Sequence, residues 1–447
     1  MKEREFAYSS NISYIFIPMN FSDADDFQKV CSEFNACGAW EQLNSKWKYM
    51  LKYVADKFDA SKPEQCRCFH YILNNDARTR AGIAAADEWY SLGTTGYLDN
   101  ADEVFRFRIL DVELFCFSTS VCIMAFKVNF ETKDPLRIAT AQYNLKKVSK
   151  EKIHIKTHDP HKIKTTTFLE LAKRLVSFSE FSVNFDFFYY AVENQERSNM
   201  LTYVEVDNKE DYKKELFYLR RCYSDGYLYY DNEEVNARET YIPSPDTHWG
   251  ITSEAVVCLV CPDKGKGEFL KDVFFKNFNT QYLFTYVLLL HQKYALYTFL
   301  SKIGNGIDND LETLESYQQQ LYEFETDFVF SYITEVPQYQ NLYSRIYQAF
   351  HIDRIFKDVN EPIKSLSDVR RNYTEKKQKE RDDRINSLLF AISLLSIFSM
   401  LSDGHTYIQQ LFGNCLSETT VSCMQYGFLA AAIVCLIVFA YKAIKKD

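Results

Sequence analysis

The chain has 447 residues and a formal net charge of −9. Hydrophobic residues make up 47% and charged residues 25%, with only 13 glycines and 9 prolines, which excludes disordered and collagen-like classes. The acidic balance argues against a protein that coats nucleic acid, because duplex binding depends on clustered lysine and arginine. At this length we expect two or three domains.

The start of the chain and its cysteines indicate the cellular compartment in which the protein is expected. The first ten residues carry charges but no apolar core followed by a small-residue cleavage site, so no secretory signal is expected. Most of the 12 cysteines, for example Cys116, Cys122 and Cys258, fall in apolar or strand-like runs. We expect most of them to be buried, reduced thiols.

Residues 1–275 mix strand and helix patterns. Runs rich in aromatic and β-branched residues predict strands, and apolar residues at helical spacing predict helices. The predicted strands lie at 13–21, within 104–130, near 200–206 and at 251–260, and the predicted helices at 166–180 and 211–224. These elements predict an α/β or α+β domain in the cytoplasm over residues 1–275.

The segment 146–164 is the main basic stretch of this acidic chain, with seven lysines and three histidines. Such a stretch can hold a multiply charged anion, for example a nucleotide, or the phosphate surface of a membrane. A solvated loop is the plainer alternative. The candidate anion-binding residues are Lys146, Lys147, Lys150, Lys152 and Lys156.

After Gly265 and Gly267 the pattern becomes helical and nearly continuous. The segment 282–300 predicts a buried helix rather than a membrane span, because His291, Gln292 and Lys293 stand at its centre. Apolar residues at every third or fourth position predict a helix from about 311 to 332.

Two further helices complete this part. One is predicted at about 338–350. The next is predicted to start at Asn360 and Pro362 and to continue without a break to about residue 401. Residues 276–384 are therefore expected to form a helical stalk.

Two uncharged runs of 18 residues lie near the end of the chain, at 385–402 and 424–441. As a helix each run is about 27 Å long, close to the roughly 30 Å hydrocarbon thickness of a bilayer. Because backbone polar groups in lipid must pair within their own segment, the two runs predict a hairpin of transmembrane helices. A pair of buried core helices is the alternative.

The charges around the two runs predict an orientation. Lysines and arginines precede the first run and follow the second, and the intervening 403–423 has neither. Both termini are therefore expected in the cytoplasm, with 403–423 as an external loop and 442–447 as a basic cytoplasmic tail. This pattern predicts a multi-pass protein of the inner (cell) membrane.

The order of these parts resembles the CorA family of divalent-cation channels. The resemblance covers the whole chain in architecture and is most specific from Tyr282 onwards, in YLFTYVLLLHQKYALYTFL, the stalk and the two uncharged runs. It implies a funnel-shaped homopentamer whose first membrane helix lines a pore. Its implied partners are further copies of the chain and the lipid bilayer, and its implied ion is magnesium.

One motif departs from the family pattern. The Gly-Met-Asn signature after the first span is missing, and Ser402-Asp403-Gly404-His405 stands there instead. Loss of that filter counts against selective magnesium uptake. CorA-like proteins without the signature are similar to those found beside type III CRISPR systems. That subgroup implies an antiviral membrane effector opened by a nucleotide second messenger, such as an S-adenosylmethionine–AMP conjugate.

The resemblance gives the first run a pore-lining face. Its candidate residues fall within a sector of about 80° on a helical wheel. Rings of Asn386 and Ser393 would offer oxygens to a hydrated cation, whereas serines that only allow close helix packing are the alternative. The candidate pore-lining residues are Asn386, Leu389, Ser393, Ser396 and Met400.

Acidic residues and cysteines flank this run. Asp382 and Asp383 would form a cation-attracting ring at the cytoplasmic mouth, unless Asp383 simply pairs with Lys379 on a solvated helix. In the external loop, the candidate residues are Asp403 and Glu418 as weak attractors of cations, and Cys415 and Cys423 as a disulfide.

No enzyme motif is found, neither a phosphate-binding GxxxxGK[ST] loop nor HExxH or GxSxG, and no enzyme activity is expected. The three histidines of 154–161 are interrupted by Pro160, so no metal site and no covalent cofactor are predicted. The preferred hypothesis is an oligomeric channel gated by a nucleotide-type ligand, without direct binding of nucleic acid. The alternatives are a magnesium transporter and a membrane-tethered binding module without a pore.

Overall fold

The computed structural model describes most of the chain. The described ranges are 6–21, 27–44, 47–92, 105–156, 163–178, 184–188, 196–206, 212–224, 226–262, 267–304 and 311–412, with scattered positions between 417 and 434. The chain divides into two compact units, residues 1–364 and residues 365–447.

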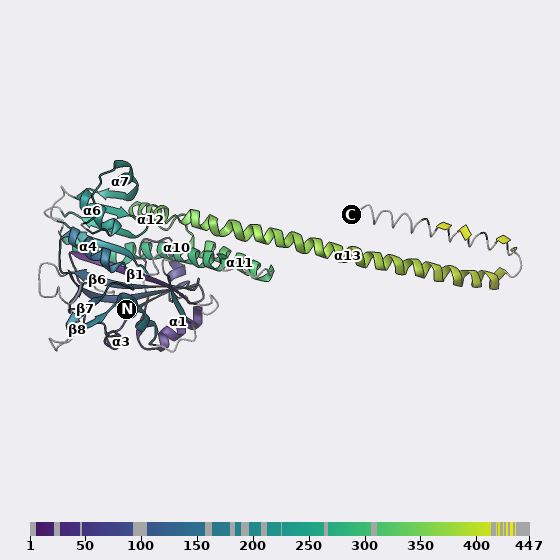
Figure 1. The fold of residues 1–447 in the computed structure, drawn as a ribbon, viewed down its shortest axis with the longest axis horizontal. Coiled ribbons are helices and arrows are strands. Elements are labelled where there is room, and N and C mark those ends of the chain that lie inside the picture. The colour runs from purple at the N-terminus through teal and green to yellow at the C-terminus, as the bar shows by residue number, and fades with distance from the viewer. Residues whose placement is uncertain are drawn as a thin grey trace. The chain divides into compact units, whose positions relative to one another are not determined.

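A mixed sheet of 13 described strands forms the centre of the first unit (Figure 1). Ten strands follow the order β11-β12-β13-β10-β1-β6-β5-β4-β7-β8, while β3 joins β2 to β5 and β9 pairs with β1. Among the described pairs only β10 and β13 run parallel. The strands are β1 (Asn11–Phe21), β2 (Trp40–Leu43), β3 (Cys68–Leu73), β4 (Tyr90–Leu92), β5 (Phe105–Phe117), β6 (Val121–Phe130), β7 (Ile153–Lys156), β8 (Ile163–Thr166), β9 (Phe185–Phe187), β10 (Asn199–Glu205), β11 (Thr240–Ser244), β12 (Thr247–Ile251) and β13 (Ala255–Val260).

The central strand β1 supplies both hydrophobic cores. Successive side chains of a strand point to opposite faces, so Tyr14 and Phe16 join one buried cluster while Ile15 and Ile17 join the other. All four side chains are at most 1% exposed. The sheet is therefore covered on both faces.

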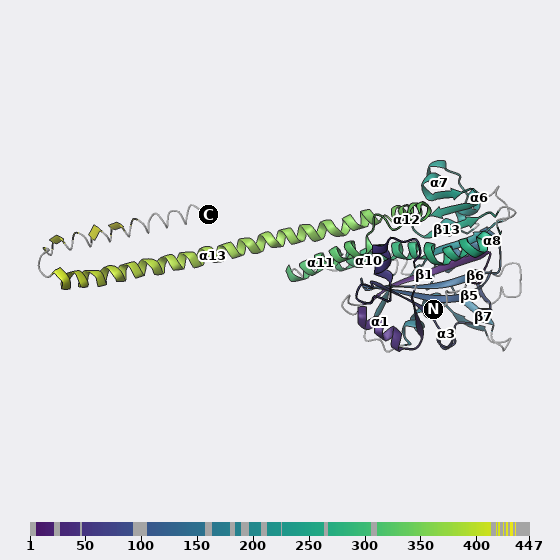
Figure 2. The same cartoon turned by 180° about the vertical axis from the view of Figure 1, so that it is seen from behind.

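Helices form the two covering layers. One layer consists of α1 (Phe27–Ala36), α3 (Asn75–Ala81), α4 (Pro135–Leu145), α5 (Phe168–Val176) and α6 (Tyr212–Arg221). The other consists of α2 (Lys52–Ala55), η2 (Asp56–Phe58), α10 (Leu283–Gly304), α11 (Leu311–Phe328), α12 (Pro337–Ala349) and the beginning of α13 (Ile352–Phe412). The short α7 (Glu233–Glu239) has no buried residue and lies next to α6 in both views (Figure 1, Figure 2).

The helical segment that leads into α10 starts at Gly267, as predicted, and is irregular. Residues 267–304 are helical throughout, in the order α8 (Gly267–Phe269), η4 (Leu270–Phe274), α9 (Phe275–Asn277), η5 (Phe278–Tyr282) and α10, where η4 and η5 are π-helical. At the centre of α10, His291 and Gln292 are fully buried and Lys293 is 5% exposed. The buried helix predicted for 282–300 is therefore present.

The start of α13 differs from the prediction. The helix begins at Ile352, not at Asn360, and it continues through Pro362. The chain turns before it, because His351 has a φ of 55°, in the left-handed region. A proline ten residues into a long helix was therefore misread as a helix start.

The predicted membrane hairpin is contradicted. Within the described residues, no helix has an apolar stretch long enough to cross a membrane. The first run, 385–402, lies in α13 and contains Asn386 and five serines, so it is uncharged without being uniformly apolar. Much of the second run, 424–441, lies outside the described residues. This finding corrects the predicted fold class, the location in the cell membrane and the interpretation as a membrane channel.

Candidate anion-binding site

The structure separates the five lysines predicted to bind an anion. Lys146 caps the C-terminus of α4, Lys147 and Lys150 lie in the turn that follows, and Lys152 precedes β7. Lys150 and Lys152 are exposed, and the side chain of Lys156, at the end of β7, lies outside the described residues. Only Lys146 and Lys147 have described neighbours that define a site.

Lys146 has a structural partner. Its ammonium lies 2.8 Å from the carboxylate of Glu254, and its side chain is only 8% exposed. The side chain of Arg197 approaches the same carboxylate at 4.0 Å. A buried cation with a close carboxylate stabilises the junction of α4 with the turn between β12 and β13, and it is not available to a ligand.

Lys147 has an aromatic neighbour instead. Its Nζ lies 3.9 Å from the ring centroid of Tyr143, one turn earlier in the chain. Hydrogen bonding and the positive charge of Lys147 lower the pKa of Tyr143 below its usual value. Lys147 forms no ion pair with a described residue, so its charge remains available to an incoming anion.

Two further rings extend this surface. Tyr223 and Tyr227 are stacked with centroids 4.2 Å apart and planes at 13°, and Tyr143 meets Tyr227 edge-on at 6.0 Å. We call the rings of Tyr143, Tyr223 and Tyr227 the tyrosine platform. Tyr227 is 43% exposed, and the adjacent Leu228 is 92% exposed. The platform thus combines accessible aromatic area with the cation of Lys147.

The tyrosine platform was not predicted from the sequence. The tyrosine-rich run 223–230 was a usable signal, but it stands about 80 residues from Tyr143. A contact between helix α4 and the segment after α6 depends on the tertiary fold, which local periodicity does not encode.

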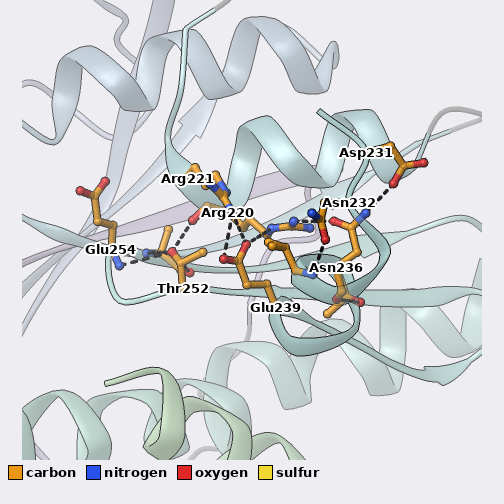
Figure 3. Close-up of polar contacts among 11 residues, drawn as sticks. Arg220, Arg221, Asp231, Asn232, Asn236, Glu239, Thr252 and Glu254 are labelled. Carbon is orange, nitrogen blue, oxygen red and sulfur yellow. Dashed lines mark hydrogen bonds and ion pairs between the residues drawn. The ribbon is translucent and has the colours of Figure 1, made fainter. Parts of the chain in front are cut away.

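A polar network holds the segment after α6 in place (Figure 3). Arg220 is 1% exposed and donates from Nε to Glu239 at 2.9 Å and from Nη2 to Asn236 at 2.7 Å. Arg221 donates to both carboxylate oxygens of Glu239, at 2.8 and 2.7 Å. Asn236 in turn donates to Asp231 at 2.6 Å. The network ties α7 and residue 231 to the end of α6.

Two more contacts fix the ends of this segment. Asn232 caps α7 by accepting from the amide of Val235 at 3.0 Å. The hydroxyl of Tyr218 on α6 donates to the carbonyl of Tyr227 at 2.5 Å. Because both ends are held, the exposed rings are presented in a fixed arrangement, which lowers the entropy lost on binding.

The turn between β12 and β13 contacts Arg220 of this network (Figure 3) and also contacts α10. The Thr252 hydroxyl donates to the Arg220 carbonyl at 2.5 Å and accepts from the amide of Ala255 at 3.2 Å. Lys293 on α10 donates to the carbonyl of Ser253 at 3.2 Å. Burial lowers the pKa of Lys293 to about 8, because removal from water disfavours the charged ammonium.

The candidate pore-lining residues lie on α13, in the second unit. Asn386, Leu389, Ser393 and Ser396 are exposed, and the side chain of Met400 is outside the described residues. The hydroxyls of Ser393 and Ser396 donate to carbonyls one turn earlier in the same helix, at 2.8 and 3.0 Å. These serines therefore satisfy their hydrogen bonds locally.

The candidates for the cytoplasmic mouth, the external loop and the disulfide lie partly outside the described residues. Asp382 and Asp383 are exposed on α13. Asp403 belongs to the same helix, so the predicted loop 403–423 begins in helix, but the side chain of Asp403 and all of Glu418 lie outside the described residues. Cys423 is an exposed free thiol, and Cys415 also lies outside the described residues.

No group of three or more His, Cys, Asp or Glu side chains is placed to hold a metal ion in the part of the chain that the structure describes. Three buried thiols lie close together in the core. The Cys116 sulfur lies 3.3 Å from that of Cys122 and 3.8 Å from that of Cys31. Burial is the main cause that raises the pKa of the Cys116 and Cys122 thiols, so both stay protonated and behave as core residues.

No family model, no curated protein and no solved structure matches the chain.

Proposed function

We propose that the first unit binds a small nucleotide-type anion at the tyrosine platform, with Lys147 as the contact for a phosphate. The observation that carries this proposal is the position of the Lys147 ammonium, 3.9 Å from the Tyr143 ring and without an ion-pair partner among the described residues. A cation so placed attracts an anion whose planar part lies against the rings.

The neighbouring residues support a nucleotide over a simple anion. Stacking of a base on an aromatic ring contributes about 1–3 kcal/mol, and the exposed Tyr227 supplies such a ring. A hydrogen bond between an ammonium and a phosphate contributes roughly 1.5–3 kcal/mol. Together these contributions amount to about 2.5–6 kcal/mol, less than the roughly 8 kcal/mol of micromolar binding. The network around Arg220 holds the rings in place, so less of this energy is lost in ordering them on binding.

A binding experiment on the full chain tests this function. Isothermal titration calorimetry with AMP, ADP, S-adenosylmethionine and an S-adenosylmethionine–AMP conjugate would rank the candidate ligands. For those that carry phosphate we expect Lys147→Gln to weaken binding about tenfold, because one charge-assisted contact is lost. Lys147→Arg should retain most of the affinity, since it keeps the charge.

A matched control separates this site from general charge effects. Lys150 lies three residues further on, is exposed and carries the same charge. Lys150→Gln removes one positive charge from the same basic segment without touching the tyrosine platform, so affinity should stay within about twofold of the unmodified chain. Equal weakening by the two substitutions would reduce the proposal to diffuse electrostatic attraction, and absence of binding by all four compounds would refute it.

A further inference from the structure

A cleft opens at the tip of the hairpin formed by β5 and β6, away from the residues of the tyrosine platform. Its volume is about 510 Å³, within the range of pockets that accept small organic ligands. Its walls come from α1, the residue before β3, the hairpin turn, α10 and α11. We call it the hairpin cleft and define it by Phe27, Arg67, Thr119, Phe299, Phe324 and Asp327.

The inner wall of the hairpin cleft is apolar. Phe27, Phe299 and Phe324 are buried side chains, at most 8% exposed, that line it from three different helices. They offer a surface to a ring or a short alkyl group. Burial of such a group contributes about 25 cal/mol for each Å² removed from water.

The hydroxyl of Thr119, at the cleft, is held by a hydrogen bond to a buried histidine. Thr119 in the hairpin turn lies 2.7 Å from His291 Nε2. His291 is fully buried between the rings of Phe117 and Phe328, and burial lowers the pKa of His291 well below its usual value, so the imidazole is neutral. Its Nδ1 has no hydrogen-bond partner among the described residues.

The missing partner at Nδ1 indicates which nitrogen carries the proton. A buried N–H without an acceptor is rarer in folded proteins than a buried acceptor without a donor. The tautomer with the proton on Nε2 leaves only an acceptor unpaired, and in it His291 donates to the oxygen of Thr119. The hydroxyl proton of Thr119 is then available to an acceptor atom in the hairpin cleft.

A guanidinium stands at the same cleft. Arg67 donates from Nε to Asp327 at 2.7 Å and from Nη1 to the carbonyl of Glu64 at 3.1 Å. In the described part of the chain no acceptor contacts its Nη2. Lys57 also pairs with Asp327, so two cations share one carboxylate and the group keeps one net positive charge.

We propose that the hairpin cleft is a second binding site, which accepts a small organic anion with an apolar ring or chain. The anionic group accepts hydrogen bonds from Thr119 and from Arg67 Nη2, and the apolar part lies against Phe27, Phe299 and Phe324. Such a ligand carries one carboxylate or phosphate on an apolar body of roughly ten heavy atoms. A molecule of this size fits within the volume of the cleft.

Two glutamines allow a matched test. Gln28 is an exposed residue of α1 at the cleft, whereas Gln319 is an exposed residue of α11 that does not line it. Replacing either by tryptophan adds the same bulk at a helix surface. Only Gln28→Trp should fill the cleft, so the pair separates occlusion of the cleft from a general effect on the fold.

The experiment is a calorimetric titration of benzoate and of phenyl phosphate into full-length chains that all carry Lys147→Gln, so that the tyrosine platform does not contribute. We expect at least one compound to bind one to one, with affinity lost by more than tenfold in Gln28→Trp and unchanged in Gln319→Trp. Thr119→Val, which keeps the side-chain shape, should weaken binding about tenfold. Binding by neither compound, or binding that Gln28→Trp leaves intact, would overturn the proposal.

Discussion

Two groups of basic side chains lie close together in the fold, and they differ in how they are paired. Arg220 is 1% exposed and its described hydrogen bonds go to Glu239 and Asn236. Lys147, in the turn after α4, lies over the ring of Tyr143 and forms no ion pair with a described residue. Pairing, and not residue type, therefore separates a cation that stabilises the fold from one that can receive a ligand.

The comparison also explains why both groups are needed. The rings beside Lys147 belong to the segment that follows α6, and the arginine network fixes that segment through α7 (Figure 3). Without the network, Tyr227 would have to be ordered when the ligand arrives, at a cost of roughly 0.5–1.5 kcal/mol for each side chain immobilised. Stability in the first group thus supports affinity in the second.

The largest expected loss of stability follows from replacing the buried arginine. Arg220→Met leaves Asn236 without its donor and removes one of the two cations on Glu239, so we expect the free energy of unfolding to fall by about 3 kcal/mol. Urea unfolding followed by circular dichroism measures this. Arg238→Met, an exposed residue of α7, is the control and should change stability by less than about 0.5 kcal/mol. Equal effects of the two would show that Arg220 has no special role.

A smaller effect should appear as a dependence on pH. The pKa of Lys293 is lowered to about 8 by burial, so the unfolded chain, where a lysine has its usual pKa of about 10.4, binds this proton more tightly. Stability must therefore rise with pH between about 8 and 10. The Lys293 ammonium faces the rings of Tyr294, Tyr297 and Phe350. The negative charge of Glu254 raises the pKa of Lys293 and so partly offsets the effect of burial.

The substitution Lys293→Met isolates this contribution. We expect the difference in unfolding free energy between the unmodified chain and Lys293→Met to shift by about 1.5 kcal/mol in favour of the unmodified chain from pH 8 to pH 9.5. Guanidinium unfolding at several pH values measures it, and subtraction removes the titration of other groups. A difference independent of pH would mean that Lys293 keeps an ordinary pKa.

The turn between β12 and β13 should show an effect of similar size. Thr252→Val removes a hydroxyl that bonds to Arg220 O and to the amide of Ala255, at a cost of about 1.5 kcal/mol. Ser253→Ala, at the next and exposed position, should be nearly neutral. If thermal unfolding shows the two variants equally stable, the turn does not connect α6 to the sheet as described.

The sequence predicted the regular elements of the first unit with good accuracy where the periodicity was strong. The strand predicted at 13–21 appears as β1 (Asn11–Phe21), and the run 104–130 contains β5 and β6. These strands are rich in aromatic and β-branched residues, which fit a sheet covered on both faces. The helix predicted at 166–180 is shorter, Phe168–Val176, and begins with the capping box of Thr167 and Glu170.

Features that depend on distant contacts could not be predicted in this way. The five candidate lysines looked equivalent in sequence, yet the fold buries Lys146 against Glu254 and leaves Lys147 beside Tyr143. The uncharged run 385–402 was interpreted by its lack of charge, which gave too little weight to its serines and Asn386. The hairpin cleft joins five separate segments, so no local pattern in the sequence indicates it.

The role of Lys147 is tested by comparing the binding affinities of AMP and adenosine, which differ by one phosphate. Both are measured on the full chain and on its Lys147→Gln variant. If Lys147 receives the phosphate, AMP should bind about tenfold more tightly than adenosine to the unmodified chain, and the variant should bind both with the affinity of adenosine. Preference for AMP that survives the substitution unchanged would contradict the assignment of the phosphate contact to Lys147.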